Sequence, residues 1–507
     1  MKRALELRQL LCELGPSATI EGDDSCVIRG IEHDSRRVKV GDLFVARQGQ
    51  RARGVDFVTD AVSKGAAAVM ATATTEVPSL NVPVLRADNL PLAFGKVASA
   101  LHNHPSFSLE VIGVTGTNGK TTTTHLIQYA IDAANGAASC GVVGTLGHQF
   151  GEFFHTSSFT TPEANELQES LSKMVDLGAT HVSMEVSSHA LEQGRVLGMQ
   201  FRVGVFTNLT QDHLDFHGTM QAYAAAKAKL FVECAPSAAV INVDDAFGEE
   251  LAKTLTIPVI RVSKRQPFAD VFLTSCSCSL EGLDMQVRTP SGPIALKTRL
   301  VGEHNAENVL ITLGVMTALN LDVQRAADAL METKGVAGRL ERCDEQPDDP
   351  LVLVDYAHTP DALARALQTC RSLTQGRLFV VFGCGGDRDP TKRAPMGCIA
   401  AETADVIVVT NDNPRSEDPR SIARAIEEGI RTVSSKHAYS IELDRGRAIA
   451  FAVVTAEAGD VVLIAGKGHE THQILGPNTV AFDDRVEATK ALRARRTERA
   501  QQDRPSA

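Results

Sequence analysis

Short apolar runs alternate with longer amphipathic stretches along most of this chain, and this alternation restricts its fold more than any other feature. The apolar runs have the length of buried strands, whereas several of the stretches that follow them have helical periodicity. Strands that alternate with helices form a parallel sheet covered by helices, so the pattern predicts an α/β fold. Buried strands are expected at residues 109–114, 181–186, 203–207, 239–243, 351–354, 378–382, 406–410 and 461–465. Helices are expected at residues 121–134, 360–373 and 419–433.

The chain length of 507 residues corresponds to about three domains at roughly 150 residues each. Two boundaries can be placed from local composition. Pro105 should stop the helix that precedes the strand at 109–114, and the acidic stretch 343–350, which contains prolines, is typical of a linker. The predicted domains are therefore residues 1–106, 107–342 and 343–507. The charged tail from Arg493 onward is expected to be disordered.

Composition excludes several classes of function. Lys plus Arg total 51 and Asp plus Glu total 62, and a formal net charge of −11 argues against binding to nucleic acid or to an anionic membrane. The charged start Met1–Arg8 lacks the apolar run of a signal peptide, and we find no apolar window long enough to span a membrane. Only Cys276 and Cys278 lie close together, without a second pair at zinc spacing. We therefore expect a cytoplasmic protein with reduced cysteines.

The strongest local signal is an apolar strand that runs into a glycine-rich turn and then into Gly119-Lys120-Thr121. Glycines let backbone N–H groups curl around phosphate oxygens, the start of the next helix adds partial positive charge, and Lys120 adds a full one. The Thr121 hydroxyl would be placed to bind Mg²⁺. The usual pattern has glycine five positions before Gly119, where Val114 stands, so the sequence predicts a variant phosphate loop.

Further oxygen and nitrogen ligands follow two other predicted strands. Glu185 ends one of them, and a single loop after the next, residues 207–218, contains Thr, Asn, Asp and His side chains. These are side chains that could supply the additional oxygen ligands a magnesium site needs. Taken alone, a strand-end glutamate is more often solvated and a histidine more often structural.

At this point the motifs resemble those of the Mur ligases, in the same order and over about residues 30–490. The phosphate loop carries the first of them, and Asp412-Asn413-Pro414-Arg415 resembles the signature of the version that adds meso-diaminopimelate. The start of the chain, His33-Asp34-Ser35-Arg36 with residues 41–46, is similar to a uridine-nucleotide domain. The intervening motifs are Glu185-Val186-Ser187-Ser188-His189, residues 212–218, 226–231, 302–308 and 338–341, and Asp355-Tyr356-Ala357-His358-Thr359-Pro360.

The resemblance implies an ATP-dependent amide ligase of bacterial cell-wall synthesis with three α/β domains. These would be an N-terminal uridine-nucleotide-binding domain, a central phosphate-loop ATPase domain and a C-terminal Rossmann-like domain. It further implies a monomer whose substrates are ATP, UDP-N-acetylmuramoyl-dipeptide and meso-diaminopimelate, with Mg²⁺ and a carbamate formed from CO₂ on Lys227.

Site residues follow from the resemblance position by position. The implied ATP contacts are Gly116, Thr117, Asn118, Gly119, Lys120, Thr121, Thr122, Asn305, Arg339 and Asp355, and the implied catalytic residues are Lys120, Lys227, His213 and Arg339. The implied metal site comprises Thr121, Glu185, His213 and carbamylated Lys227. The implied UDP-muramoyl-dipeptide contacts are His33, Ser35, Gln50, Arg51, Ala52, Thr160, Thr161, Ser187, Gln193 and Arg195. The implied diaminopimelate contacts are Arg388, Asp412, Asn413, Pro414, Arg415, Gly466 and Glu470.

Two alternatives remain open from the sequence. One is another amide ligase on the same scaffold, such as folylpolyglutamate synthase or a lysine-adding homologue. The other is a phosphate-loop switch or regulator that binds nucleotide without ligation. The N-terminal segment of about 100 residues argues for a uridine-nucleotide substrate, and the dense polar loop after Thr207 argues against the second alternative.

Overall fold

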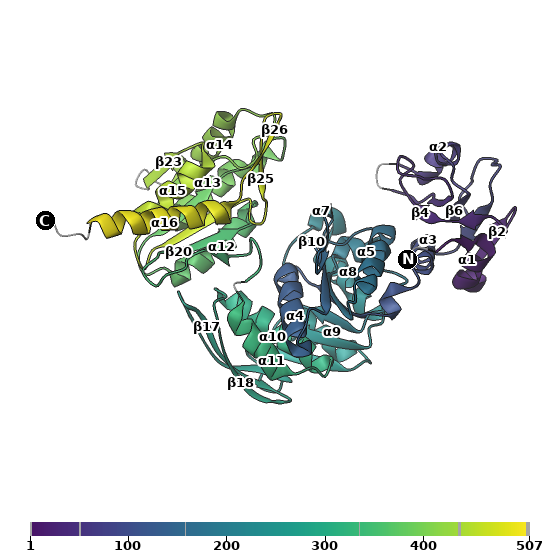
Figure 1. Cartoon of the computed structure of the whole chain (residues 1–507), viewed down its shortest axis with the longest axis horizontal. Helices are drawn as coiled ribbons and strands as arrows, with labels where there is room; N and C mark the ends of the chain where they lie inside the picture. Colours follow the sequence, from purple (N-terminus) through teal and green to yellow (C-terminus); the bar gives the residue numbers. More distant parts are fainter. Residues whose placement is uncertain (1–2, 50–51, 158, 334, 434–437, 503–507) are drawn as a thin grey trace. The chain divides into compact units, whose positions relative to one another are not determined.

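The computed structural model describes residues 3–49, 52–157, 159–333, 335–433 and 438–502, and its elements are labelled in Figure 1. The chain forms two compact units. The first unit comprises Met1–Leu273, Val287–Ile294 and Glu307–Ala329, and the second comprises Thr274–Gln286, Ala295–Ala306 and Leu330–Ala507. The three predicted domains stay a prediction. Each unit is described separately below.

The first unit begins with a five-stranded sheet in the order β2-β7-β6-β5-β4, parallel except for the edge strand β2. Alternate residues of β5 face opposite sides: Leu43 and Val45 pack with α1 and α3, whereas Phe44 packs with α2. The strands are β2 (Ala18–Glu21), β4 (Gly30–Glu32), β5 (Asp42–Val45), β6 (Ala68–Thr72) and β7 (Val84–Ala87). The helices are α1 (Leu7–Leu14), α2 (Val58–Ser63) and α3 (Leu90–Leu101).

The first unit continues with a larger sheet, in which the strands β9-β12-β8-β13-β14-β15 are parallel neighbours in that order. Its strands are β8 (Glu110–Thr115), β9 (Cys140–Gly144), β12 (His181–Glu185), β13 (Val203–Phe206), β14 (Ala238–Asn242) and β15 (Val259–Ser263), with β10 (Gly147–Phe150) and β11 (Phe153–His155) antiparallel at the edge. Its helices are α4 (Lys120–Asn135), α5 (Ala164–Asp176), α6 (Ser188–Glu192), α7 (Leu214–His217), α8 (Met220–Val232) and α9 (Ala246–Thr254).

The parallel arrangement of β8, β12 and β13 places the loops that follow them at one edge of the sheet. Because β12 and β13 both pair with β8, the segments after all three strands leave the same edge of the sheet. This edge carries the predicted phosphate loop, Glu185 and the polar loop after Thr207. The following elements, β16 (Val271–Ser279), β17 (Gly282–Thr289), β18 (Gly292–Thr298), α10 (Glu303–Ala318) and α11 (Val323–Glu332), are divided between the two units.

The second unit is a six-stranded sheet in the order β19-β20-β24-β21-β22-β23, parallel except at β19. Leu351 and Leu353 of β20 pack against α12, α13 and α14, whereas Val352 and Val354 pack against α15 and α16, so helices cover both faces. The strands are β19 (Glu341–Arg342), β20 (Leu351–Asp355), β21 (Leu378–Phe382), β22 (Val406–Val409), β23 (Ala438–Ile441) and β24 (Val461–Ala465), with a separate hairpin of β25 (His472–Leu475) and β26 (Asn478–Ala481). The helices are α12 (Pro360–Leu373), α13 (Arg393–Thr403), α14 (Pro419–Val433), α15 (Arg445–Thr455) and α16 (Asp484–Gln502).

The α/β prediction is confirmed, and the eight expected strands and three expected helices all form, with ends shifted by no more than a residue or two. The expectation of a disordered tail from Arg493 is wrong for residues 493–502, and residues 503–507 lie outside the described residues. Helix α16 continues to Gln502, because its apolar side packs on the sheet and Arg495, only 2% exposed, donates a hydrogen bond of 2.9 Å to the Ala456 carbonyl. Among the described residues, no helix is long and apolar enough to cross a membrane.

Candidate functional site

The phosphate loop joins β8 to α4 and needs glycine at two positions. Gly116 has φ of 149°, and a Cβ there would lie 1.8 Å from Thr207 Oγ1. Gly119, with φ of 84°, precedes the first residue of α4 in a left-handed conformation that favours glycine. Val114 is a buried residue of β8, which ends only at Thr115, so the position where the usual pattern has glycine belongs to the strand.

Side chains from the loop after β13 hold the phosphate loop in shape. The backbone N–H of Asn118 donates to Asn208 Oδ1 at 2.9 Å, and the Thr207 hydroxyl donates to the Asn118 carbonyl at 2.7 Å. The Lys120 ammonium folds back over the loop and donates to the carbonyls of Gly116 and Thr117, both at 2.9 Å. Thr122 follows in the first turn of α4. The predicted phosphate contacts of residues 116–122 are thus contiguous and lie at one sheet edge.

Thr121 and Glu185 come together beside this loop. The Thr121 hydroxyl donates to Glu185 Oε2 at 3.0 Å, and the backbone N–H of Thr145 donates to Glu185 Oε1 at 2.7 Å. Glu185 is 1% exposed, because it ends β12 directly beside β8. A buried carboxylate beside a hydroxyl is a donor set that a hard divalent cation such as Mg²⁺ prefers, so these residues fit the predicted metal.

Lys227 lies on α8 and points at the same loop. Its side chain is 1% exposed, its Nζ lies 4.2 Å from the ring centroid of Tyr223, and it donates to the Gly116 carbonyl at 2.7 Å. Burial, followed by the charge of Lys120, lowers the pKa of Lys227 well below its ordinary value. Lys227 is therefore a buried lysine with a lowered pKa. Lys229 differs, because it forms an ion pair with Glu192 at 2.9 Å.

His213 is in a different environment. Its side chain is about half exposed, its backbone has φ of 51°, and its ring lies 4.9 Å from that of His189. Among the described residues no three His, Cys, Asp or Glu side chains form a group that could hold a metal ion. The structure thus brings Thr121 and Glu185 into direct contact, whereas His213 belongs to an aromatic cluster with His189, Phe216, His217 and Tyr223.

The predicted muramoyl-peptide contacts of the first unit form one connected network. Thr161 Oγ1 accepts from the Ser187 backbone N–H at 2.9 Å, and the Thr161 carbonyl accepts from Arg195 Nη1 at 2.8 Å. Arg195 also donates to Gln193 Oε1 from Nε and Nη2, at 3.0 and 2.7 Å. Thr160 lies next to this network and accepts from the Thr145 hydroxyl at 3.2 Å.

The predicted uridine-nucleotide residues are only partly described. Ser35 is buried, and its carbonyl accepts from Lys64 Nζ at 3.1 Å. Burial and the charge of Arg47 lower the pKa of His33. Ala52 is exposed, and its carbonyl accepts from Gly49 N–H at 3.0 Å. Gln50 and Arg51 lie outside the described residues.

Three predicted ATP contacts belong to the second unit. Asn305 is 3% exposed and donates to the Val301 carbonyl at 2.8 Å. Asp355 ends β20 and accepts from the backbone N–H groups of Leu340 and Ala357, both at 2.8 Å. Burial raises the pKa of Asp355 although the charge of Arg339 opposes the shift. Arg339 itself lies over Tyr356, 5.4 Å from the ring centroid.

The predicted diaminopimelate residues meet at the carboxyl ends of β21, β22 and β24. Asn413 Nδ2 donates to Glu470 Oε2 at 2.9 Å, and the fully buried Lys467 donates to the same oxygen at 2.7 Å. Burial raises the pKa of the Glu470 carboxyl, but Lys467 and Asn413 outweigh it and hold this pKa below its ordinary value. Asp412 is buried beside Gly466, whose Cβ position would lie 3.3 Å from Asp412 Oδ2.

Arg415 is held in this loop by one edge of its guanidinium. Its Nη1 donates to the Gly386 carbonyl at 2.8 Å, and Gly386 lets the two loops approach, since a Cβ there would lie 1.9 Å from the Pro414 carbonyl oxygen. Within the part of the chain that the structure describes, the Nε and Nη2 edge of Arg415 makes no hydrogen bond. Arg388 is exposed in the neighbouring loop after β21. The Nε and Nη2 pair is the geometry that binds a carboxylate by two parallel hydrogen bonds.

Sequence reasoning missed several residues that shape these sites. Lys467 stands between Gly466 and Gly468, and these flanking glycines were the only sign that it would be buried. Tyr223 lies on α8 outside the quoted motifs, and Asn308 ends the motif 302–308 but was assigned no role. Tyr223 hydrogen-bonds the Thr117 hydroxyl at 3.2 Å, and Asn308 Oδ1 accepts from Thr123 at 3.2 Å.

Three protein-family models match successive parts of this chain. A model of the Mur ligase family catalytic domain matches residues 27–104, a model of the Mur ligase middle domain matches residues 114–316, and a model of the Mur ligase glutamate ligase domain matches residues 338–468.

Whole proteins are also similar over nearly the full chain. A UDP-N-acetylmuramoyl-L-alanyl-D-glutamate–2,6-diaminopimelate ligase of Synechococcus elongatus is 43% identical over 97% of this chain and 100% of its own. The enzyme of the same name from Geobacillus kaustophilus is 42% identical over 92% of this chain and 95% of its own. A solved structure of a ligase with that name superposes with a TM-score of 0.72 at 34% identity, covering 97% of this chain and 100% of the other.

Proposed function

This chain belongs to the Mur ligase family, and we propose that it uses ATP to join meso-diaminopimelate to the side-chain carboxylate of D-glutamate in UDP-N-acetylmuramoyl-L-alanyl-D-glutamate. The observation that carries the proposal is the convergence of Lys120, Lys227 and the Thr121–Glu185 pair on one phosphate loop. The near full-length similarity to diaminopimelate-adding ligases supports the choice of substrates.

Amide formation from a carboxylate is uphill, so the carboxylate is first activated. Its oxygen attacks the γ-phosphorus of ATP, the bond to the β–γ bridging oxygen breaks, and an acyl phosphate and ADP form. The neutral amine of diaminopimelate then attacks the acyl carbon, loses a proton and displaces phosphate. Lys120 offers a fixed positive charge where negative charge builds up on the transferring phosphoryl group, and Arg339 is proposed to add a second one.

Thr121 and Glu185 are proposed to hold Mg²⁺, together with His213 and a carbamate on Lys227. When bound, this ion would neutralise charge on the phosphate oxygens. The low pKa of Lys227 supports carbamylation, because only a neutral amine attacks CO₂, forming the N–C bond with loss of one proton. The carbamate nitrogen keeps one N–H for the Gly116 carbonyl.

The remaining predicted contacts are grouped here according to the substrate that each would bind. ATP would be bound by residues 116–122 and by Asn305, Arg339 and Asp355 of the second unit. The sugar-peptide would be bound by His33, Ser35, Gln50, Arg51, Ala52, Thr160, Thr161, Ser187, Gln193 and Arg195. Diaminopimelate would be bound by Arg388, Asp412, Asn413, Pro414, Arg415, Gly466 and Glu470.

Trapping of the acyl phosphate tests this function. With ATP and UDP-muramoyl-L-alanyl-D-glutamate but no diaminopimelate, hydroxylamine should yield a hydroxamate on the D-glutamate side chain, detected by mass spectrometry. An analogue with D-glutamine in place of D-glutamate is the control and should yield none, because its side chain has no carboxylate to activate. ATP hydrolysis at the same rate with and without the acceptor, and no hydroxamate, would refute the proposal.

A further inference from the structure

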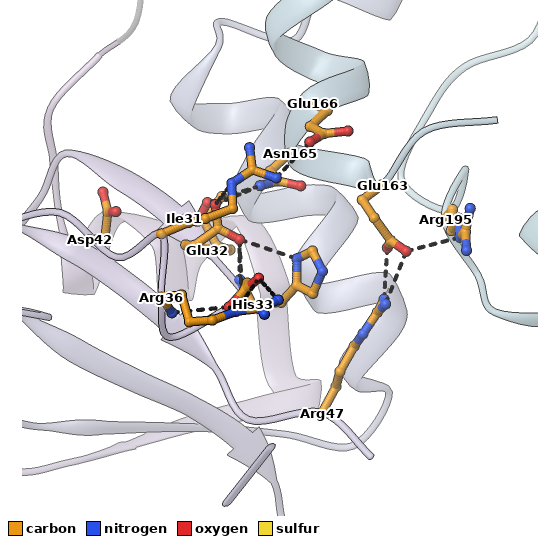
Figure 2. Close-up of polar contacts among 12 residues, drawn as sticks. Ile31, Glu32, His33, Arg36, Asp42, Arg47, Glu163, Asn165, Glu166 and Arg195 are labelled. Atoms are coloured by element: carbon orange, nitrogen blue, oxygen red, sulfur yellow. Dashed lines mark hydrogen bonds and ion pairs between the residues drawn. The ribbon is translucent and has the colours of Figure 1, made fainter. Parts of the chain in front are cut away.

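Glu163 lies between two arginines that come from distant parts of the first unit. Figure 2 shows its carboxylate facing Arg47 on one side and Arg195 on the other. Arg47 donates to both oxygens, from Nη1 at 2.8 Å and from Nη2 at 3.0 Å, while Arg195 Nε lies 3.1 Å from Oε1. Glu163 is 5% exposed and Arg195 is 9% exposed, so water screens these contacts weakly.

Each of the three residues is placed by its local structure. Glu163 directly precedes helix α5, a position where backbone N–H groups favour negative charge. Arg47 follows β5 of the N-terminal sheet by two residues. Arg195 follows α6, in the same turn as Gln193. The carboxylate therefore links the N-terminal sheet to the segment that carries two of the proposed sugar-peptide contacts.

That segment is also clamped against the N-terminal helix α3. A Cβ on Gly95 of α3 would lie 1.9 Å from the Leu197 carbonyl oxygen, and a Cβ on Gly194 would lie 2.7 Å from Pro91 Cβ. Two backbones can approach this closely only where side chains are absent. The turn of residues 193–198 is thus fixed by α3 on one side and by Glu163 on the other.

The charges of Arg47 and Arg195 favour the ionised form of Glu163. Burial by itself raises the pKa of Glu163, but the hydrogen bonds and charge of Arg47 and the charge of Arg195 outweigh it, and the pKa is lowered. A neutral residue in its place would leave the largely buried guanidinium of Arg195 facing the partly exposed one of Arg47 without a compensating charge. Arg195 would then lose the contact that, with Thr161 and Gln193, fixes its orientation.

We propose that Glu163, together with Arg47, is a positioning residue that holds Arg195 and Gln193 in the geometry that receives the muramoyl-dipeptide. This inference rests on the proposed function of the same site. Neither Glu163 nor Arg47 needs to touch the substrate, because Glu163 acts through Arg195 and Arg47 acts through Glu163.

Steady-state kinetics of Glu163→Gln and Arg47→Gln test this role, with each substrate varied in turn. We expect Glu163→Gln to raise the KM for UDP-muramoyl-dipeptide by about tenfold or more, since one charge-assisted contact is lost. The KM values for ATP and diaminopimelate should stay within about twofold. Arg47→Gln should raise the same KM by a smaller factor, and the double variant should be no worse than Glu163→Gln alone, because both act through one contact chain.

A second ion pair gives a matched control. Arg37 Nη1 and Glu166 Oε1 are 2.8 Å apart and link the loop between β4 and β5 to α5, beside a cavity of about 270 Å³ lined also by Glu32 and Asn165. Neither residue contacts Arg195, so Arg37→Gln and Glu166→Gln should leave all three KM values within about twofold of wild type.

Different kinetic results would overturn the positioning role of Glu163 and the proposed function. An unchanged KM for UDP-muramoyl-dipeptide in Glu163→Gln, or an equal rise in the Glu166→Gln control, would overturn the inference. If Glu163→Gln does not fold, judged by its melting temperature, Arg47→Gln decides. Its side chain is 30% exposed, so we expect this variant to fold, and an unchanged KM there also overturns the inference. A wild-type protein that does not use UDP-muramoyl-dipeptide at all would instead refute the proposed function.

Discussion

Replacing Lys227 by alanine is expected to lower the rate of phosphate release by about a hundredfold or more. The side chain is buried against the phosphate loop, with its Nζ 2.7 Å from the Gly116 carbonyl oxygen. Loss of one group that stabilises the reacting phosphoryl centre typically costs a factor of roughly 10²–10³ in kcat. If the active form is a carbamate, small carboxylates such as acetate or formate should restore part of the activity of Lys227→Ala and leave wild type unchanged.

The neighbouring lysine provides the control. Lys229 lies on the same helix and pairs with Glu192, so Lys229→Ala should keep activity within about twofold of wild type and should not respond to acetate. In ¹³C-bicarbonate, an NMR carbamate signal should appear in wild type and in Lys229→Ala but not in Lys227→Ala. Full activity of Lys227→Ala, or an undiminished carbamate signal in it, would contradict the assignment.

Replacing Arg415 by alanine is expected to reduce kcat/KM for meso-diaminopimelate between roughly 30-fold and several thousand-fold, which corresponds to about 2–5 kcal/mol for truncating one member of a buried charge pair. The reason is geometric. Arg415 is anchored through Nη1 to the Gly386 carbonyl at 2.8 Å, and we propose that its Nε and Nη2 edge binds the distal carboxylate of diaminopimelate. Lysine has no such carboxylate, so wild type should discriminate strongly against it.

Binding of ATP separates this effect from general damage. Because the proposed phosphate contacts of residues 116–122 lie in the first unit, Arg415→Ala should bind ATP within about twofold of wild type by calorimetry. Its reduced activity should be confined to the amino-acid substrate. A variant that lost ATP affinity and diaminopimelate use together would contradict a role specific to diaminopimelate.

Strands and helices with a clear local sequence pattern were predicted correctly. The strands at 378–382 and 461–465 and the helices at 360–373 and 419–433 have the expected bounds, because apolar runs and proline-initiated helices are local signals. The tail from Arg493 was mispredicted for the same reason: its charge suggested disorder, whereas Arg495 is buried through a contact with Ala456, distant in sequence.

Only the parts of the candidate site that have a local motif could be predicted from the sequence. The phosphate loop has a local motif, and the contact of Thr121 with Glu185 follows once β8 and β12 are neighbours. The burial of Lys227 and Lys467 depends on packing between elements, and only Lys467 has a local signal, its two flanking glycines. Glu163 could not be found from sequence, since its partner Arg47 is 116 residues away. The roles of these residues, and the monomeric state, stay predictions.

The most direct test of the central claim is phosphate release by the purified chain with each substrate omitted in turn. We expect release only when ATP, UDP-muramoyl-L-alanyl-D-glutamate and meso-diaminopimelate are all present, with one tripeptide product formed per phosphate. Replacing meso-diaminopimelate by L-lysine should lower kcat/KM by at least about 30-fold, since the Arg415 contact is then lost. Phosphate release that does not depend on the dipeptide acceptor, or equal use of L-lysine, would contradict the account.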